Sequence, residues 1–286
     1  MRGNEKGSPY FHTVIILVRR ITAACALSAA LTACAATPQP VRPAPSATTT
    51  APSAPPTLAP GPGGLTPVFK NGSRTHGRTV ALTFDADMTA DQGARAAAGE
   101  HFDNPGLIAA LRALKVPATV FMTGRWAEQY PEQARSLGRN PLFEVANHSY
   151  SHYAFTGDCD GLPTVPGDRM RADVERAYAA FRRAGVPDAR PYFRFPGGCY
   201  DRRALKALTP VGVTAVQWDV VSGDAFATDA EAVTRQVLEG VRPGSVVVMH
   251  CTRSAAPTTE RVVRAVVPEL RERGFRFVKV SELIGS

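Results

Sequence analysis

The sequence predicts an α/β domain built around a parallel β-sheet, arranged either as one β/α barrel or as a doubly wound sheet. Two observations predict this class. Short apolar runs alternate with amphipathic stretches from about residue 80 to the C-terminus, and no long polar gap divides them into halves. The polar residues best suited to chemistry follow the ends of these runs, where parallel sheets assemble their active sites.

Apolar runs of strand length recur along this part of the chain. Short runs of this kind, bounded by turn residues, are typical of strands buried within a sheet. We expect strands at Val80–Phe84, Ala118–Met122, Leu142–Ala146, Tyr192–Phe195, Val213–Trp218, Ser245–Met249 and Phe275–Val278.

The stretches between these runs have the apolar spacing of amphipathic helices. One stripe covers Leu107 to Leu114, and Asn104-Pro105 before it suits an N-cap followed by a first turn. A second stripe runs from Met170 to Phe181 and is ended by Gly185 and Pro187. Further helices are expected at Arg202–Leu208, Ala230–Leu238 and Thr259–Arg273.

Residues 1–34 have the pattern of an export signal. Arg19 and Arg20 precede an uncharged stretch, Ile21 to Ala33, which is too short for a comfortable transmembrane helix. Its end, Leu-Thr-Ala-Cys, resembles a bacterial lipobox, in which Cys34 is lipidated and becomes the mature N-terminus. We therefore expect a protein anchored by lipid to the outer face of the cell membrane, within the cell wall. The alternative is an ordinary signal peptide, which would leave the protein secreted.

The next segment, residues 35–67, is rich in Pro, Ala, Thr and Ser and is expected to be a disordered linker. Residues 68–286 remain for one globular domain.

The chain carries a net charge of +8, and removal of residues 1–34, with four basic residues and one acidic residue, leaves +5. This excess suits a polyanionic wall, but no basic run with interleaved aromatics indicates nucleic acid.

Two histidines four residues apart, His148 and His152, indicate a metal site. From one helical turn, both imidazoles could reach the same cation, and a carboxylate from Asp85 or Asp87 would complete three ligands. Three protein ligands with one open position are typical of catalytic zinc, whereas structural zinc sites usually have four. The alternative is an exposed histidine pair that binds nothing. The metal interpretation is favoured because Asp85, His148, Arg194, Asp224 and His250 all lie at or after the ends of predicted strands.

Five segments occur in a characteristic order. They are T-F-D-A-D at Thr83–Asp87, H-S-Y-S-H at His148–His152, R-F-P-G-G at Arg194–Gly198, W-D-V-V-S-G-D at Trp218–Asp224 and V-M-H at Val248–His250. With these segments the chain resembles the polysaccharide deacetylases of the NodB-homology type, carbohydrate esterase family 4, over about Arg78 to Ile284. The resemblance implies an irregular seven-stranded parallel β/α barrel. It also implies hydrolysis of N-acetyl groups, and sometimes O-acetyl groups, on glycans.

The resemblance implies a divalent cation held by His148, His152 and an aspartate. Ala86 stands where the family's ligand aspartate is expected, so we assign the ligand to Asp87 and the general base to Asp85. Residues two apart at a strand end project to the same side, which lets both carboxylates converge. The opposite assignment of the two aspartates stays open. Zinc is the expected ion, with cobalt, nickel or iron as alternatives for this donor set.

The remaining roles come from the same resemblance. Arg194 matches the arginine that holds the base, and the backbone N–H of Gly197 matches the oxyanion donor. His250 matches the general acid that protonates the departing amine. Val221 replaces an aspartate that charges this histidine in many relatives, and Asp219 or Asp224 is expected to substitute.

Two further expectations concern loops. The loop after Asp87, through residues 92–104, is longer than usual and is expected to line the substrate groove. Cys159 and Cys199 both fall in loops at the proposed active-site face, where a disulfide would restrain the loop of Gly197. Cys251 would then be unpaired, partly buried and inert. The alternative leaves all three thiols free.

The sequence thus predicts an exported, metal-dependent deacetylase. Its expected substrate is an acetylated cell-wall polysaccharide, an N-acetylhexosamine polymer and peptidoglycan in particular, and we expect a monomer with no nucleic-acid partner. One alternative is an O-acetyl esterase acting on xylan or another glycan. A second is a non-catalytic glycan-binding lipoprotein, which Ala86 and Val221 keep open.

Overall fold

The computed structural model describes residues 54–286. The predicted export signal, the lipobox cysteine and the linker up to residue 53 lie outside the described residues. Within 54–286, no helix combines the length and the apolar character that a bilayer span requires.

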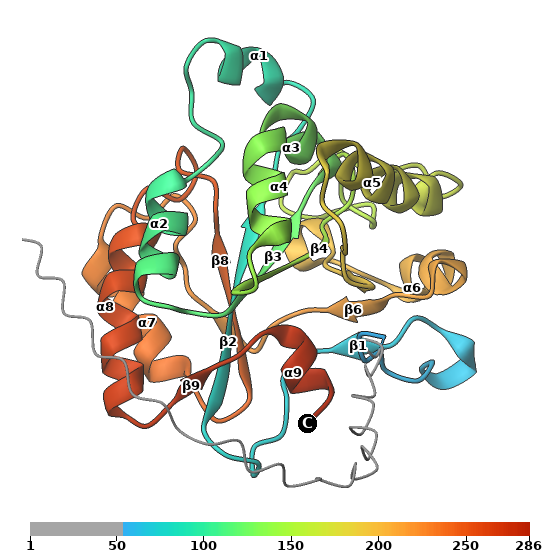
Figure 1. The fold of residues 1–286 in the computed structure, drawn as a ribbon. Helices are drawn as coiled ribbons and strands as arrows, with labels where there is room; N and C mark the ends of the chain where they lie inside the picture. The colour runs from blue at the N-terminus through green and yellow to red at the C-terminus, as the bar shows by residue number, and fades with distance from the viewer. Residues whose placement is uncertain (1–53) are drawn as a thin grey trace, which may run out of the picture. The chain divides into compact units, whose positions relative to one another are not determined.

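The described residues form one parallel sheet that curls into a half-barrel, with helices around it (Figure 1). Its order is β1-β6-β5-β4-β3-β2-β8-β7, and β9 pairs with the start of β2. Every strand pair is parallel, so the predicted barrel-like α/β class is confirmed. The strands are β1 Val68–Phe69, β2 Thr79–Ala86, β3 Ala118–Met122, β4 Phe143–Asn147, β5 Tyr192–Phe193, β6 Thr214–Val216, β7 Val220–Val221, β8 Ser245–His250 and β9 Arg276–Phe277.

All seven predicted strands are present, and two short strands are added. These are β1 and β7, which lie at the two ends of the sheet order and are each two residues long. A two-residue strand has no apolar run or alternation of its own, because only its pairing with a neighbour defines it. The prediction of seven strands was therefore two short of the number among the described residues.

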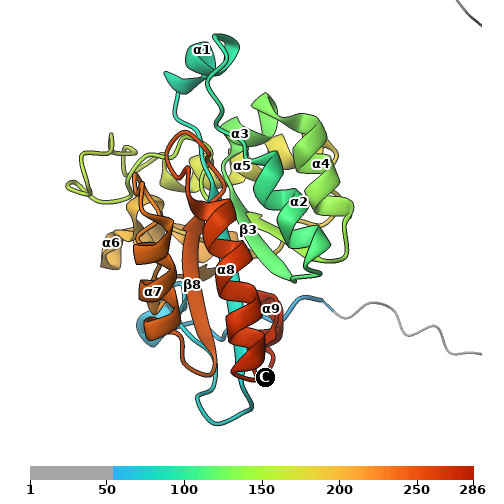
Figure 2. The same cartoon turned by 90° about the vertical axis from the view of Figure 1, so that its left-hand side faces the viewer.

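Helices cover the outer face of the sheet (Figures 1 and 2). The five predicted helices are confirmed, and the Asn104 side chain caps the first of them by accepting from the Leu107 N–H at 3.0 Å. Four short helices were missed. The predicted ones are α2 Pro105–Ala113, α5 Met170–Ala184, α6 Arg202–Leu208, α7 Ala230–Gly240 and α8 Thr259–Glu272, and the missed ones are α1 Gln92–Ala97, α3 Gly124–Gln129, α4 Pro131–Arg139 and α9 Val280–Ile284.

Side-chain alternation along the strands separates two apolar clusters. On β2, Val80, Leu82 and Phe84 belong to the cluster that packs against the helices, whereas Ala81 belongs to the barrel interior. The interior is filled by residues from most strands, namely Phe69, Ala81, Phe121, Ala146, Tyr192, Val216, Val246 and Val278. Because side chains alternate along a strand, residues two positions closer to the carboxyl end of a strand than these also face the interior. On several strands they therefore lie at the mouth of the barrel.

The linker prediction is wrong for residues 54–67, which pack against the barrel. The Leu58 N–H donates to Thr214 Oγ1 at 3.1 Å, and the Tyr192 hydroxyl donates to the Pro56 carbonyl at 2.8 Å. Leu58 also packs against the interior cluster. Composition suggested disorder, but the partners that order this segment lie more than 130 residues away in the sequence.

Candidate metal centre and active site

The predicted site residues meet at the carboxyl ends of the strands. Asp85 follows Ala81 and Thr83 on the interior face of β2, and His250 follows Val246 and Val248 in the same way on β8. On β4, Ala146 faces the interior, and His148, two residues later and just beyond the strand, faces the same way. On β5, Tyr192 and Arg194 are related in the same manner. Four strands thus direct polar side chains into one mouth, as in other β/α barrels.

Asp87, His148 and His152 form a cluster suited to a metal ion. One ligand atom from each lies within 4.8 Å of the others. Burial lowers the pKa of both histidines to about 4, so the imidazoles are neutral and able to coordinate. His148 Nδ1 lies 2.9 Å from the Arg194 carbonyl, which makes Nδ1 the donor and leaves Nε2 as the free ligand atom.

The histidines do not share a helical turn, which corrects the prediction. Their segment is a loop in which Ser149 (φ 70°) and His152 (φ 58°) take the left-handed conformation. Hydrogen bonds offset the strain of these two residues, because the Ser149 N–H donates to Asn147 Oδ1 at 2.8 Å and the His152 N–H donates to Ser149 Oγ at 2.9 Å. This loop brings the two imidazole centroids to 5.0 Å from each other.

Asp173 on α5 is an anchor of this loop that sequence reasoning missed. Its Oδ1 accepts from the Tyr150 N–H at 2.7 Å. No spacing rule connects a helix residue with a loop more than twenty positions earlier. An aspartate in the first turn of a helix was the only local signal, and it has a common capping explanation.

Asp85 is paired with a fully buried arginine. Arg194 Nη1 donates to Asp85 Oδ1 at 2.7 Å, and Arg194 also lies over the Phe121 ring, 3.9 Å from its centroid. Burial raises the pKa of Asp85, but the charges of Arg194, His148 and His250 and the hydrogen bond from Arg194 together outweigh it, so the pKa lies below its ordinary value. Asp85 Oδ2 is 3.7 Å from His148 Nε2, so this ionised carboxylate lies beside the metal cluster without being one of its three members.

His250 is paired with Asp224, one of the two aspartates expected near it. His250 Nδ1 lies 2.8 Å from Asp224 Oδ1, and the His250 N–H donates to Oδ2 at 2.8 Å. Burial lowers the pKa of His250, but the hydrogen bond and charge of Asp224, with the charges of Asp85 and Asp87, overcome this and raise it to about 9. Asp219 instead accepts from Arg74 at 2.7 Å and from Ser245 at 2.8 Å.

The predicted disulfide joins the loop of Gly197 to the loop of Cys159. Cys159 and Cys199 are bonded, with their Cα atoms 5.9 Å apart, so this prediction is confirmed. Gly197 has φ 65°, and a Cβ there would lie 2.5 Å from Cys159 Sγ, so the position requires glycine. Cys251 is free and fully buried, and burial raises the pKa of its thiol to about 12. A thiol this basic and this buried is not a nucleophile.

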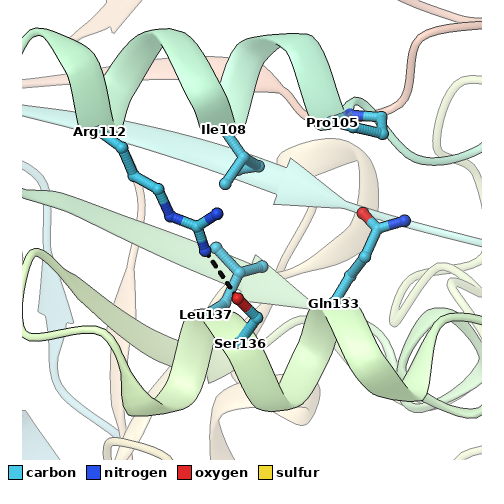
Figure 3. A pocket seen from close by; sticks show the side chains of 6 residues that line it. All are labelled: Pro105, Ile108, Arg112, Gln133, Ser136 and Leu137. Carbon is cyan, nitrogen blue, oxygen red and sulfur yellow. Dashed lines mark hydrogen bonds between the residues drawn. The ribbon is translucent and has the colours of Figure 1, made fainter. Parts of the chain in front are cut away.

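A hollow of about 170 Å³, apart from the barrel mouth, lies between α2 and α4 (Figure 3). It is lined by both apolar and polar side chains, and Arg112 donates to Ser136 across it at 2.7 Å. None of the predicted site residues lines this hollow. This hollow therefore has no part in the site predicted from the sequence.

Comparisons with known proteins agree with the geometry. A family model of polysaccharide deacetylases matches residues 72–216. A chitooligosaccharide deacetylase from Bradyrhizobium sp. is 28% identical, over 72% of this chain and 90% of the relative. A peptidoglycan-N-acetylglucosamine deacetylase from Bacillus cereus is 28% identical, over 71% of this chain and 67% of the relative. The crystal structure of Bc1960, a peptidoglycan N-acetylglucosamine deacetylase, has the same fold, with a TM-score of 0.65 at 24% identity over 77% of this chain and 94% of that one.

Proposed function

Because this chain belongs to the polysaccharide deacetylase family, we propose that it removes N-acetyl groups from an N-acetylhexosamine polymer of the cell wall, peptidoglycan in particular. The observation that carries the proposal is the convergence of an ionised carboxylate, a three-residue metal cluster and a charged histidine at one barrel mouth. Relatives named as peptidoglycan deacetylases support the choice of polymer.

The donor set of Asp87, His148 and His152 fits a divalent cation. The imidazoles are neutral, and burial raises the pKa of Asp87, so a neighbouring cation would stabilise its charged form. Zinc is the expected ion, and cobalt, nickel and iron suit the same donors. When bound, the cation supplies a Lewis acid that polarises the acetyl carbonyl and eases proton loss from water.

The protein's own groups then carry out the hydrolysis. Asp85 accepts a proton from the attacking water, and Arg194 keeps this carboxylate ionised and oriented. The water oxygen bonds to the carbonyl carbon, and the Gly197 N–H donates to the oxygen on which negative charge develops. His250, kept charged by Asp224, gives a proton to the nitrogen as the C–N bond breaks. The products are acetate and a free amine.

We also propose that the protein acts outside the membrane, anchored by lipid at Cys34. The basic n-region, the short apolar stretch and the Leu-Thr-Ala-Cys sequence support this location. Residues 35–53 would then give the domain reach into the wall.

Acetate release from a panel of glycans tests the proposal. We expect release from peptidoglycan strands, loss of it with a chelator, and recovery on adding zinc. An O-acetyl esterase would instead release acetate from acetylated xylan and leave N-acetyl groups intact. A glycan-binding protein without activity would release none from any substrate.

Metal content tests the ligand set. His148→Ala and His152→Ala should each lose tight metal binding and acetate release, because two remaining ligands hold a divalent ion poorly. The exposed His76 provides the matched control, since His76→Ala should keep both. Equal metal content in all three variants would contradict the assignment.

A further inference from the structure

A hollow at the loop that follows Asp87 contains an arginine that forms no ion pair with any residue of 54–286. The hollow measures about 180 Å³ and lies between the loop that follows Asp87 and helix α3. Met88, Thr89 and Ala90 line one side, and Arg125 and Glu128 line the other. Both views of the domain show this loop and α3 at the same end (Figures 1 and 2).

The backbone that lines the hollow is joined to the segments that carry the proposed metal ligands. Met88 adjoins the metal ligand Asp87, and neighbouring Cα atoms are about 3.8 Å apart. The Met88 N–H donates to Thr123 Oγ1 at 3.1 Å, which ties the loop to the start of α3. On the other side, the Arg125 N–H donates to the carbonyl of Tyr150, which lies between the two histidine ligands. A polymer whose acetyl group is at the metal can therefore extend from the barrel mouth to this hollow, because Asp87 and Met88, which belong to the two linings, are neighbours along the chain.

Arg125 has no counterion among residues 54–286. It forms no ion pair there, and its Nε is buried without a hydrogen-bond partner in that part of the chain. Its guanidinium lies over the Tyr150 ring, 5.1 Å from the centroid, which leaves its polar edges unmatched. A partly buried cation without a partner is unfavourable, so a bound anion would stabilise it.

The one carboxylate that lines the hollow is already neutralised. Glu128 Oε1 accepts from Arg183 at 2.6 Å, and Oε2 accepts from the Tyr150 hydroxyl at 2.8 Å. Arg176 donates to the same hydroxyl at 2.9 Å. Asp91, on the exposed part of the loop, accepts from Thr89 and lies 3.8 Å from Arg95. Among the residues that line the hollow, Arg125 is therefore the cation whose charge no carboxylate balances.

We propose that this hollow is a subsite for a carboxylate of the glycan, which makes acidic strands better substrates than neutral ones. The inference rests on the proposed function and specifies its substrate class. A guanidinium binds a carboxylate through two parallel hydrogen bonds, which neutral sugar hydroxyls cannot match. The carboxylate comes either from an acid substituent on the sugar itself or from a peptide attached to it.

Kinetics with three substrates test the subsite. They are a neutral N-acetylglucosamine oligomer, wall glycan strands freed of peptide, and the same strands with peptide. Arg125→Gln should lower kcat/KM on acidic strands about tenfold, mainly through KM, and leave the neutral oligomer within about twofold. Loss on both kinds of strand identifies the sugar carboxylate, and loss only on peptide-bearing strands identifies the peptide.

Two variants separate recognition from folding. Arg125→Lys keeps the charge and should recover part of the loss, and the exposed Arg182→Gln on α5 should match wild type on all three substrates. An equal loss on the neutral oligomer, or no loss on acidic strands, would overturn the subsite. Calorimetric measurement of binding to the same glycans tests the two proposals separately. If the wild type hydrolyses none of the glycans, the proposed function is refuted, but the subsite is not. If wild type and Arg125→Gln then also bind every glycan equally, the subsite is refuted as well.

Discussion

Replacement of Asp224 by asparagine should move the basic limit of activity to lower pH. Asp224 is almost fully buried and accepts from His250 and Ser222 on Oδ1 and from His250 and Thr259 on Oδ2. Asp224 is the main cause that raises the pKa of His250 from 6.5 to about 9, and the charges of Asp85 and Asp87 add to it. The whole shift corresponds to about 3 kcal/mol in favour of the charged imidazolium. An amide in place of the Asp224 carboxylate keeps some of the hydrogen bonds but removes the charge.

The sign follows from the proposed role of His250 as the general acid. Activity needs the protonated ring, so a raised pKa preserves activity up to about pH 9 and activity falls above it. If Asp224→Asn returns the pKa to 6.5 or below, the protonated fraction falls about tenfold at pH 7.5 and roughly 75-fold at pH 8.5.

The assay is kcat/KM for acetate release from pH 5 to 10, with metal content and melting temperature measured for each variant. Asp219→Asn is the matched control, because Asp219 binds Arg74 and Ser245 rather than His250. Its basic limit should stay near pH 9. A wild-type basic limit in Asp224→Asn would refute the reasoning, and a shift in Asp219→Asn alone would assign the charging role to the other aspartate.

The remaining predictions concern the aspartates and the thiols. Asp85→Asn should keep bound metal and lose most turnover, whereas Asp87→Asn should lose metal as well; the reverse pattern of metal content would show that base and ligand are exchanged. Thiol counting on denatured, unreduced mature protein with Cys34 replaced should find one free thiol, from Cys251, and three would rule out the bridge. Before denaturation that thiol should not react, because it is buried and its pKa is raised.

Local properties of the chain predicted most of the fold. The strand over Ala118–Met122 and the helix over Arg202–Leu208 have the predicted bounds, because an apolar run and an amphipathic stripe depend only on neighbouring residues. The cap at Asn104 is equally local. The metal cluster was also predicted in composition, since His148, His152 and Asp87 are recognisable in the sequence.

What the sequence by itself determined, then, was the class of fold, the order of the main elements and the set of candidate site residues. Only the tertiary structure decided which of them meet. Asp219 and Asp224 both follow β6, and the contact of one with His250 depends on how β7 pairs with β8. The histidines converge through two left-handed residues rather than a helical turn, and residues 54–67 are ordered by partners far along the chain. Each of these outcomes depends on long-range contacts, which no local pattern records because the chain forms them only when it folds.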